Sequence, residues 1–195
     1  LIQGDRYHFS VRKGPLPEKA KEGTSAGKRA AFNCLMSETP IDYKHIRSEG
    51  LEGRIGQRLM AIVADGTRGR VFLDPTKDAE SVALSANPTW RPDCEIPKKH
   101  RNFQGPAYGL ENFGDLFTPR QLVALTTLAE IVAEVRERVV FDAIAAGVPS
   151  GGPTLESGGD DSIAYGDAVS TYLGLCVSRL TNTINSLSVW SQSRE

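Results

Sequence analysis

The sequence predicts an α+β fold in which a small antiparallel sheet unit is followed by a long irregular connector and an antiparallel two-helix hairpin. Three observations lead to this prediction. Apolar residues alternate near the start, as in half-buried strands. Five of the eleven prolines lie within residues 74–117, where the apolar residues show no periodicity, and apolar stripes at helical spacing follow residue 118. We therefore expect a basic α+β unit over 1–73, a Pro-rich connector over 74–117 and a helical hairpin over 118–195.

The composition is that of a globular protein. With 195 residues, of which 39% are apolar and 24% charged, the chain can form one ordinary domain or two small ones. The three cysteines are odd in number and far apart, which favours a reducing compartment. No apolar run is long enough to span a membrane, and the start has no signal-like core, so we expect a cytoplasmic protein. Because both ends read as interrupted, we also expect an internal segment of a longer chain.

Two strands are predicted near the start of the basic unit. Residues 6–12 alternate, with Tyr7, Phe9 and Val11 on one side. A second short strand is expected over 30–35, after a loop rich in Gly, Pro and Lys.

A short helix and a β-hairpin are predicted next. Thr39 and Pro40 should open the helix, since Thr is a favourable N-cap and Pro fits the first helical position, and it should end near Gly50. Apolar runs over 59–64 and 71–73 predict two antiparallel strands joined by a tight turn at Asp65 and Gly66.

The strongest local signal marks the start of the hairpin. Thr118 and Gln121 have the spacing of a reciprocal capping box, which predicts that a long helix begins here, and Gly147 supplies its stop. A second helix should begin near residues 160–162, where Asp160 and Asp161 complement the helix dipole, and continue to about residue 187. Gly166 and Gly174 inside it indicate a close neighbouring backbone.

Charge is distributed unevenly along the chain. Residues 1–73 carry 13 Lys/Arg and 8 Asp/Glu, whereas residues 105–195 carry 5 and 11. The first part therefore holds the best candidates for nucleic-acid binding, four of which have a glycine next to them that would let a phosphate approach the backbone. These candidates are Lys28, Arg29, Arg54, Arg58, Arg68 and Arg70. The alternatives are an ordinary solvated surface, or attraction between two subdomains of opposite charge.

No catalytic residue is predicted. The loop 23–29 has the wrong spacing for a phosphate-binding loop and carries Arg29 where Ser or Thr would hold magnesium. Close groupings such as Cys34, His45 and Asp42, or Cys94, His100 and Asp93, lack the frame of a nucleophile site.

No metal site is predicted either, although one motif has the shape of half a zinc ribbon. In Cys34-Leu35-Met36-Ser37 a hydroxyl stands in the position of the second thiolate, and serine is too weak a ligand for a structural zinc site. We interpret Cys34 and Ser37 as a degenerate half-site.

Three stretches nevertheless resemble a known family. They are GRIGQRLMAIVADGTRGRVFLDP at 53–75, YGLENFGDLFTPRQLVALTTL at 108–128 and VWSQSRE at 189–195. Together they resemble the adenine-specific DNA methylases that contain an internal zinc ribbon and an N-terminal domain of unknown function. The resemblance covers nearly the whole chain and is most specific over 108–128.

The resemblance implies a parent enzyme whose catalytic motifs lie outside this chain. In that family, the glycine-rich motif for S-adenosylmethionine precedes such a segment, and the Asp/Asn-Pro-Pro-Tyr motif for the flipped adenine follows it. Neither is present here, so no cofactor is expected in this segment and S-adenosylmethionine belongs to the parent. Relatives have a full pair of cysteines where this chain has Cys34 and Ser37.

Two functions are therefore expected. The first is a non-catalytic internal segment of a DNA adenine methyltransferase that assists DNA binding or target recognition, with DNA and the remaining methylase chain as partners. The second is a scaffold or protein-interaction insertion without nucleic-acid contact, which would leave an apolar patch exposed.

Overall fold

The computed structural model confirms the α+β class and describes residues 2–3, 6–15, 17–18, 20, 23–26, 32–99 and 101–189. Its contacts group into two compact units. Unit 1 comprises Leu1–Ser85 and Glu95–Glu111, and unit 2 comprises Ala86–Cys94 and Asn112–Glu195. The predicted connector, residues 74–117, is thus shared between both units.

The described residues of unit 1 form three two-stranded antiparallel sheets. They pair β1 (Ile2–Gln3) with β2 (Arg6–Tyr7), β3 (Phe32–Asn33) with β4 (Pro40–Ile41), and β5 (Ile62–Gly66) with β6 (Gly69–Leu73).

The strand predicted over 6–12 is confirmed only at its first two residues. An alternating sequence needs a partner ladder to satisfy its backbone groups, and β1 offers a ladder of only two residues. Further along, the Val11 amide donates instead to the Asp74 carboxylate at 2.6 Å. Of the second predicted strand, 30–35, residues 30 and 31 lie outside the described part of the chain, and only β3 is regular.

The helix expected to open at Thr39 and Pro40 begins later. Pro40 belongs to β4, where it lies opposite Asn33, and helix α2 spans Tyr43–Leu51. Its N-cap is Asp42, whose carboxylate accepts the His45 amide at 2.7 Å. Aspartate caps at least as well as threonine, and the proline is accommodated in a strand that lies at an edge. The predicted helix start was therefore wrong, whereas its end is one residue from the prediction.

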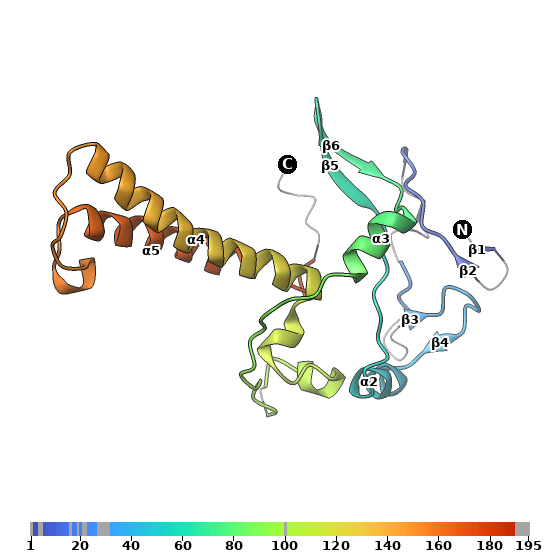
Figure 1. Cartoon of the computed structure of the whole chain (residues 1–195). Helices are drawn as coiled ribbons and strands as arrows, with labels where there is room; N and C mark the ends of the chain where they lie inside the picture. The colour runs from blue at the N-terminus through green and yellow to red at the C-terminus, as the bar shows by residue number, and fades with distance from the viewer. Residues whose placement is uncertain are drawn as a thin grey trace. The chain divides into compact units, whose positions relative to one another are not determined.

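The predicted hairpin of two strands is confirmed. Its register pairs Ile62 with Leu73 and Gly66 with Gly69, so that Thr67 and Arg68 form the turn rather than Asp65 and Gly66. The hairpin extends away from the rest of unit 1 (Figure 1).

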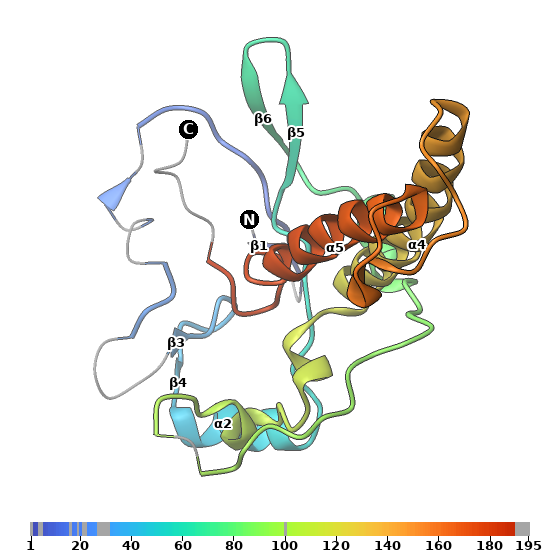
Figure 2. The same ribbon diagram turned by 90° about the vertical axis from the view of Figure 1, so that its left-hand side faces the viewer.

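The predicted irregular connector contains regular structure that its prolines concealed. Helix α3 (Lys77–Leu84) is capped by Thr76, whose hydroxyl accepts the Ala79 amide at 3.1 Å. Two 3-10 helices, η1 (Gly105–Tyr108) and η2 (Phe113–Leu116), follow. In Figure 2 the segment bearing η1 runs beside α2, and the Tyr108 carbonyl occupies the space that a side chain at Gly50 would need.

Unit 2 is built on α4 (Pro119–Ala145) and α5 (Ser162–Leu180), which pack antiparallel as predicted (Figure 1 and Figure 2). The capping box is confirmed: Thr118 Oγ1 accepts the Gln121 amide at 3.3 Å, and the Thr118 amide donates to the Gln121 side chain at 2.8 Å. The helix stops as predicted at Gly147, which has a φ of 91°. The loop between the helices includes the 3-10 helix η3 (Leu155–Ser157).

Helix α5 ends at Leu180, seven residues before the predicted end. Thr181 and Thr183 turn their hydroxyls onto the carbonyls of Ser178 and Leu180, which is the local competition by which threonine weakens a helix end. The Ser186 amide then donates to the Leu116 carbonyl at 2.8 Å. The apolar spacing that continues to Leu187 thus belongs to a chain of turns.

Few side chains are buried in the described part of the chain. The buried hydrophobic residues are Ile96, Leu122, Ala143 and Ala164, and many large apolar side chains are exposed. Among the described residues, no helix has both the length and the apolar character needed to cross a membrane.

Candidate nucleic-acid interface

The structure distributes the predicted basic residues over several parts of unit 1. Arg54 and Arg58 lie between α2 and β5, Arg68 lies in the β5–β6 turn, and Arg70 belongs to β6. Lys28 and Arg29 lie outside the described residues. The four described arginines therefore do not form a single cluster in the sequence of elements.

Arg54 is engaged by two carboxylates of its own neighbourhood. Its guanidinium donates to both oxygens of Glu49, each at 2.7 Å, and also contacts Glu52. This hydrogen bonding holds the pKa of Glu49 below its ordinary value and raises the pKa of Arg54. A phosphate would have to compete with both acids, so Arg54 is chiefly a structural residue.

Arg58 connects two segments of unit 1. It donates to Glu80 of α3 at 2.7 Å, and its guanidinium lies 5.0 Å from the centre of the Tyr7 ring in β2. The Leu59 amide donates to the same Glu80 oxygen at 3.2 Å. The hydrogen bond from Arg58 is the main cause that lowers the pKa of Glu80, and the hydrogen bond from the Leu59 amide lowers it further. Arg58 therefore positions α3 against the N-terminal strand.

A hollow beside Arg58 brings together basic residues that lie far apart in the sequence. It has a volume of about 380 Å³ and is lined by residues 6–9, 58–59, 74–77 and Glu80, which include Arg6 and Lys77. Sequence reasoning did not single out Arg6 or Lys77, because only the fold of unit 1 brings them near Arg58. Their placement enlarges the basic neighbourhood, although Asp74 and Glu80 offset part of its charge.

The β5–β6 hairpin carries the remaining two arginines of the predicted interface. Every residue of β6 is exposed, and Arg68 lies in the turn, where Gly69 has a φ of 115°. Such a conformation is open to glycine and strained for other residues. Arg70 lies opposite Asp65 in the register, so opposite charges face each other across the ribbon. Arg68 and Arg70 are thus presented on a thin two-stranded ribbon.

The Cys34 and Ser37 half-site forms a turn between β3 and β4. The hydrogen bond from Ser37 lowers the pKa of the Cys34 thiol, and Ser37 Oγ lies 3.0 Å from Thr39 Oγ1. Across the described residues, no group of three His, Cys, Asp or Glu side chains could hold a metal ion. One thiol with hydroxyl neighbours does not fit a zinc centre.

Comparison of the chain with protein-family models, with curated proteins and with solved structures finds no match.

Proposed function

We propose that this chain is a non-catalytic segment of a DNA adenine methyltransferase, in which the β5–β6 ribbon of unit 1 contacts DNA. The resemblance of residues 53–75 and 108–128 to that family suggested the parent enzyme. The observation that carries the DNA contact is the exposed ribbon with Arg68 in its turn and Arg70 in β6.

The shape of the ribbon suits a groove of duplex DNA. The major groove, about 12 Å wide, admits a two-stranded β-ribbon, and arginine is the side chain that most often makes specific contacts there. Glycines beside both arginines leave room for a backbone phosphate to approach. The proposal rests on Arg68 and Arg70 because the exposed ribbon carries them, and Arg54 and Arg58 have a supporting role.

Fluorescence anisotropy with a labelled DNA duplex tests this contact. Replacing both Arg68 and Arg70 by alanine should weaken DNA binding by about tenfold. A factor of ten in affinity corresponds to about 1.4 kcal/mol, so this expectation assigns roughly 0.7 kcal/mol to each arginine contact. Replacing Lys98 and Lys99 by alanine is the matched control, since these exposed lysines lie in a turn of the same unit. Equal losses in the two double variants would refute a contact through the ribbon.

The second candidate, a protein-interaction insertion, is favoured by the exposed apolar surface of unit 2. On α5, Tyr165, Tyr172 and Leu175 are 57%, 73% and 62% exposed. At 3.6 residues per turn, these three residues fall on one side of the helix. Large apolar side chains exposed on one side of a helix are what a surface for another protein would present.

A further inference from the structure

Helix α5 carries an exposed seam with the repeat of a coiled coil. Tyr165, Tyr172 and Leu175 are each exposed over more than half of their surfaces. Together with two further residues they recur at alternating steps of three and four, the spacing that lines the contact between helices in coiled coils. We name this set the α5 seam, and its members are Tyr165, Ala168, Tyr172, Leu175 and Arg179. The seam is distinct from the contact with α4, where Gly166 lies beside Val140.

Charge on α5 is confined almost entirely to its ends. From the first residue of the helix to Ser178, the only charged residue is Asp167, which pairs with Arg136 of α4. Asp160 lies just before the helix and Arg179 in its last turn, and both are exposed. The acidic end of one copy of α5 therefore attracts the basic end of another when the two helices lie antiparallel.

The seam is self-complementary in the antiparallel direction. A two-fold axis makes residue i of one copy contact residue j of the other, and j contact i. With this axis beside residue 170, Tyr165 lies opposite Leu175 of the second copy. Ala168 then lies opposite Tyr172 of the second copy, so that the larger ring meets a small side chain. A parallel arrangement would instead set Arg179 against Arg179. Shape and charge thus both select antiparallel contact between two copies of this chain.

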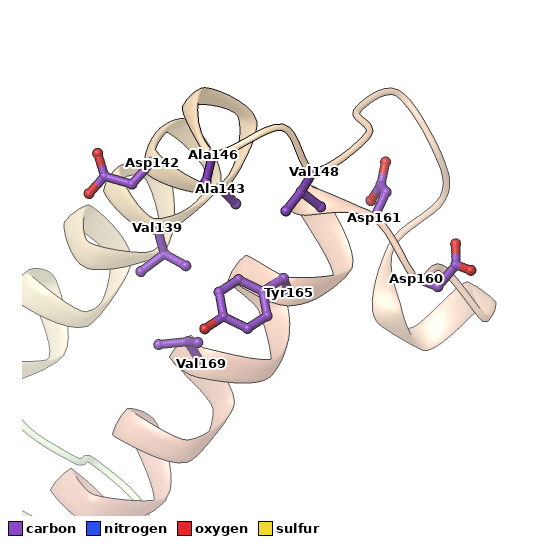
Figure 3. Close-up of a pocket in the computed structure, with 9 residues that line it drawn as sticks. All are labelled: Val139, Asp142, Ala143, Ala146, Val148, Asp160, Asp161, Tyr165 and Val169. Carbon is purple, nitrogen blue, oxygen red and sulfur yellow. The ribbon is translucent and has the colours of Figure 1, made fainter.

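A hollow beside Tyr165 offers room for the Leu175 side chain of the second copy. It has a volume of about 590 Å³ and is lined by residues of α4, of α5 and of the loop that joins them. In Figure 3 the Val139 side chain and the Tyr165 ring border this hollow, whereas the carboxylates of Asp142 and Asp160 point away from it. An aliphatic side chain suits these walls, because its entry removes apolar surface from water.

The exposed rings give the contact enough area for a moderate affinity. Tyr165 and Tyr172 are 57% and 73% exposed. A buried aromatic side chain covers about 150–250 Å², so the four tyrosines of a dimer would remove roughly 500 Å² from water. A specific interface buries about 1,200–2,000 Å² in total, of which the tyrosines supply nearly half of the lower limit. We therefore expect association in the micromolar range.

We infer that α5 is a homodimerisation surface. Two copies of this chain pack their α5 seams antiparallel about a two-fold axis, and each Arg179 pairs with Asp160 of the other copy. The inference rests on unit 2 alone and is independent of the DNA contact proposed for unit 1.

Sedimentation equilibrium of the full chain, without DNA, measures this association. A reducing buffer keeps the exposed Cys176 from forming a disulfide between copies. The mass should rise from that of one chain toward that of two as the protein concentration increases through the micromolar range. A chain that remains monomeric at about 100 µM, well above the expected dissociation constant, would overturn the inference. Because no DNA is present, this result would not bear on the ribbon.

A variant in the seam distinguishes this surface from general apolar association. Tyr172→Glu should weaken dimerisation at least tenfold, because two carboxylates would be buried without partners in each dimer. The matched control is Phe141→Glu, which adds the same charge at a similarly exposed position of α4 that lines no part of the hollow. Equal losses in the two variants would overturn the inference. Circular dichroism verifies that both variants keep their helices.

Charge reversal tests the antiparallel direction. Arg179→Glu should weaken dimerisation several-fold, and so should Asp160→Lys, because each brings like charges together at both ends of the contact. The variant that carries both substitutions restores opposite charges and should dimerise nearly as well as the unmodified chain. A double variant that dimerises no better than either single variant would overturn the antiparallel pairing.

Discussion

At the residue scale, the two glycines of α5 show how differently the same residue type can serve a helix. A side chain at Gly166 would meet Val140 of α4 and lie 3.2 Å from the Arg136 carbonyl, whereas a side chain at Gly174 would meet nothing within 4 Å. The sequence predicted a close neighbour at both positions. The prediction is confirmed at Gly166 and wrong at Gly174.

This difference predicts opposite effects of the same substitution. Gly174→Ala should raise the free energy of unfolding by about 0.5–1 kcal/mol, since alanine has the higher helix propensity and no neighbour opposes it. Gly166→Ala should lower it by about 1 kcal/mol, because overpacking exceeds the gain in propensity. Urea denaturation of the two variants beside the unmodified chain measures both. Stabilisation by Gly166→Ala would show that α4 is free to move away from α5.

Asp161 and Asp167 are the carboxylates on which the loop end of the hairpin depends. The Gly152 amide, followed by the amides of α5, lowers the pKa of Asp161. The Leu155 amide and then Arg136 lower the pKa of Asp167, and Arg136 Nη2 lies 2.6 Å from it. Both groups thus bind protons more weakly in the folded chain than an ordinary aspartate does.

The lowered pKa values predict an acid-sensitive hairpin. Their contribution to stability is complete above the ordinary aspartate pKa of about 3.9 and is lost as the pH falls through the lowered folded values. Helix content measured by circular dichroism should therefore decrease below about pH 4. Asp161→Asn keeps a capping side chain without a titrating group, so its stability should change less with pH over this range. Identical acid profiles for the variant and the unmodified chain would contradict the role of Asp161.

At the scale of elements, the ends of α4 depend on signals that are local in the sequence. Thr118 and Gln121 cap each other's amides, and Pro119 fits the first helical position. Such signals can be read without knowledge of the fold, and this is why the start of α4 was predicted correctly.

The capping box predicts a measurable contribution to stability. Thr118→Ala should lower the free energy of unfolding by about 1 kcal/mol, the typical cost of losing an N-cap side chain. Thr118→Ser, which keeps the hydroxyl, is the matched control and should retain most of the stability. Thermal unfolding followed by circular dichroism would reveal the difference; if both variants melt together, the hydroxyl is not what stabilises the helix start.

The elements that were predicted wrongly depend on partners that the sequence does not reveal. The strand expected over 6–12 shortened because β1 offers a ladder of two residues. Helix α3 was missed because flanking prolines suggested an irregular chain, although Thr76 provides a regular cap. The candidate site follows the same rule. Arg54 and Arg58 belong to ion pairs. These pairs cannot be predicted from the sequence, because it is the fold that brings Glu49 of α2 and Glu80 of α3 to the two arginines.

At the scale of the whole molecule, the small number of buried hydrophobic side chains is the property with the widest consequence. A chain of this length can form a sizeable core, yet in the described residues only four hydrophobic side chains are buried and Trp90, Phe141 and Tyr172 are each more than 60% exposed. This exposure favours a chain whose surfaces are completed by other proteins. It agrees with the proposed role as a segment that works within a larger assembly.

The central claim, that the β5–β6 ribbon contacts DNA, is tested most directly by the salt dependence of duplex binding. Each phosphate contact contributes about 0.9 to the slope of log affinity against log salt concentration. The variant with Arg68→Glu and Arg70→Glu should therefore have a slope shallower by about two, and Lys98→Glu with Lys99→Glu should leave the slope unchanged. A slope that stays the same in the arginine variant, or that falls equally in both, would contradict the account.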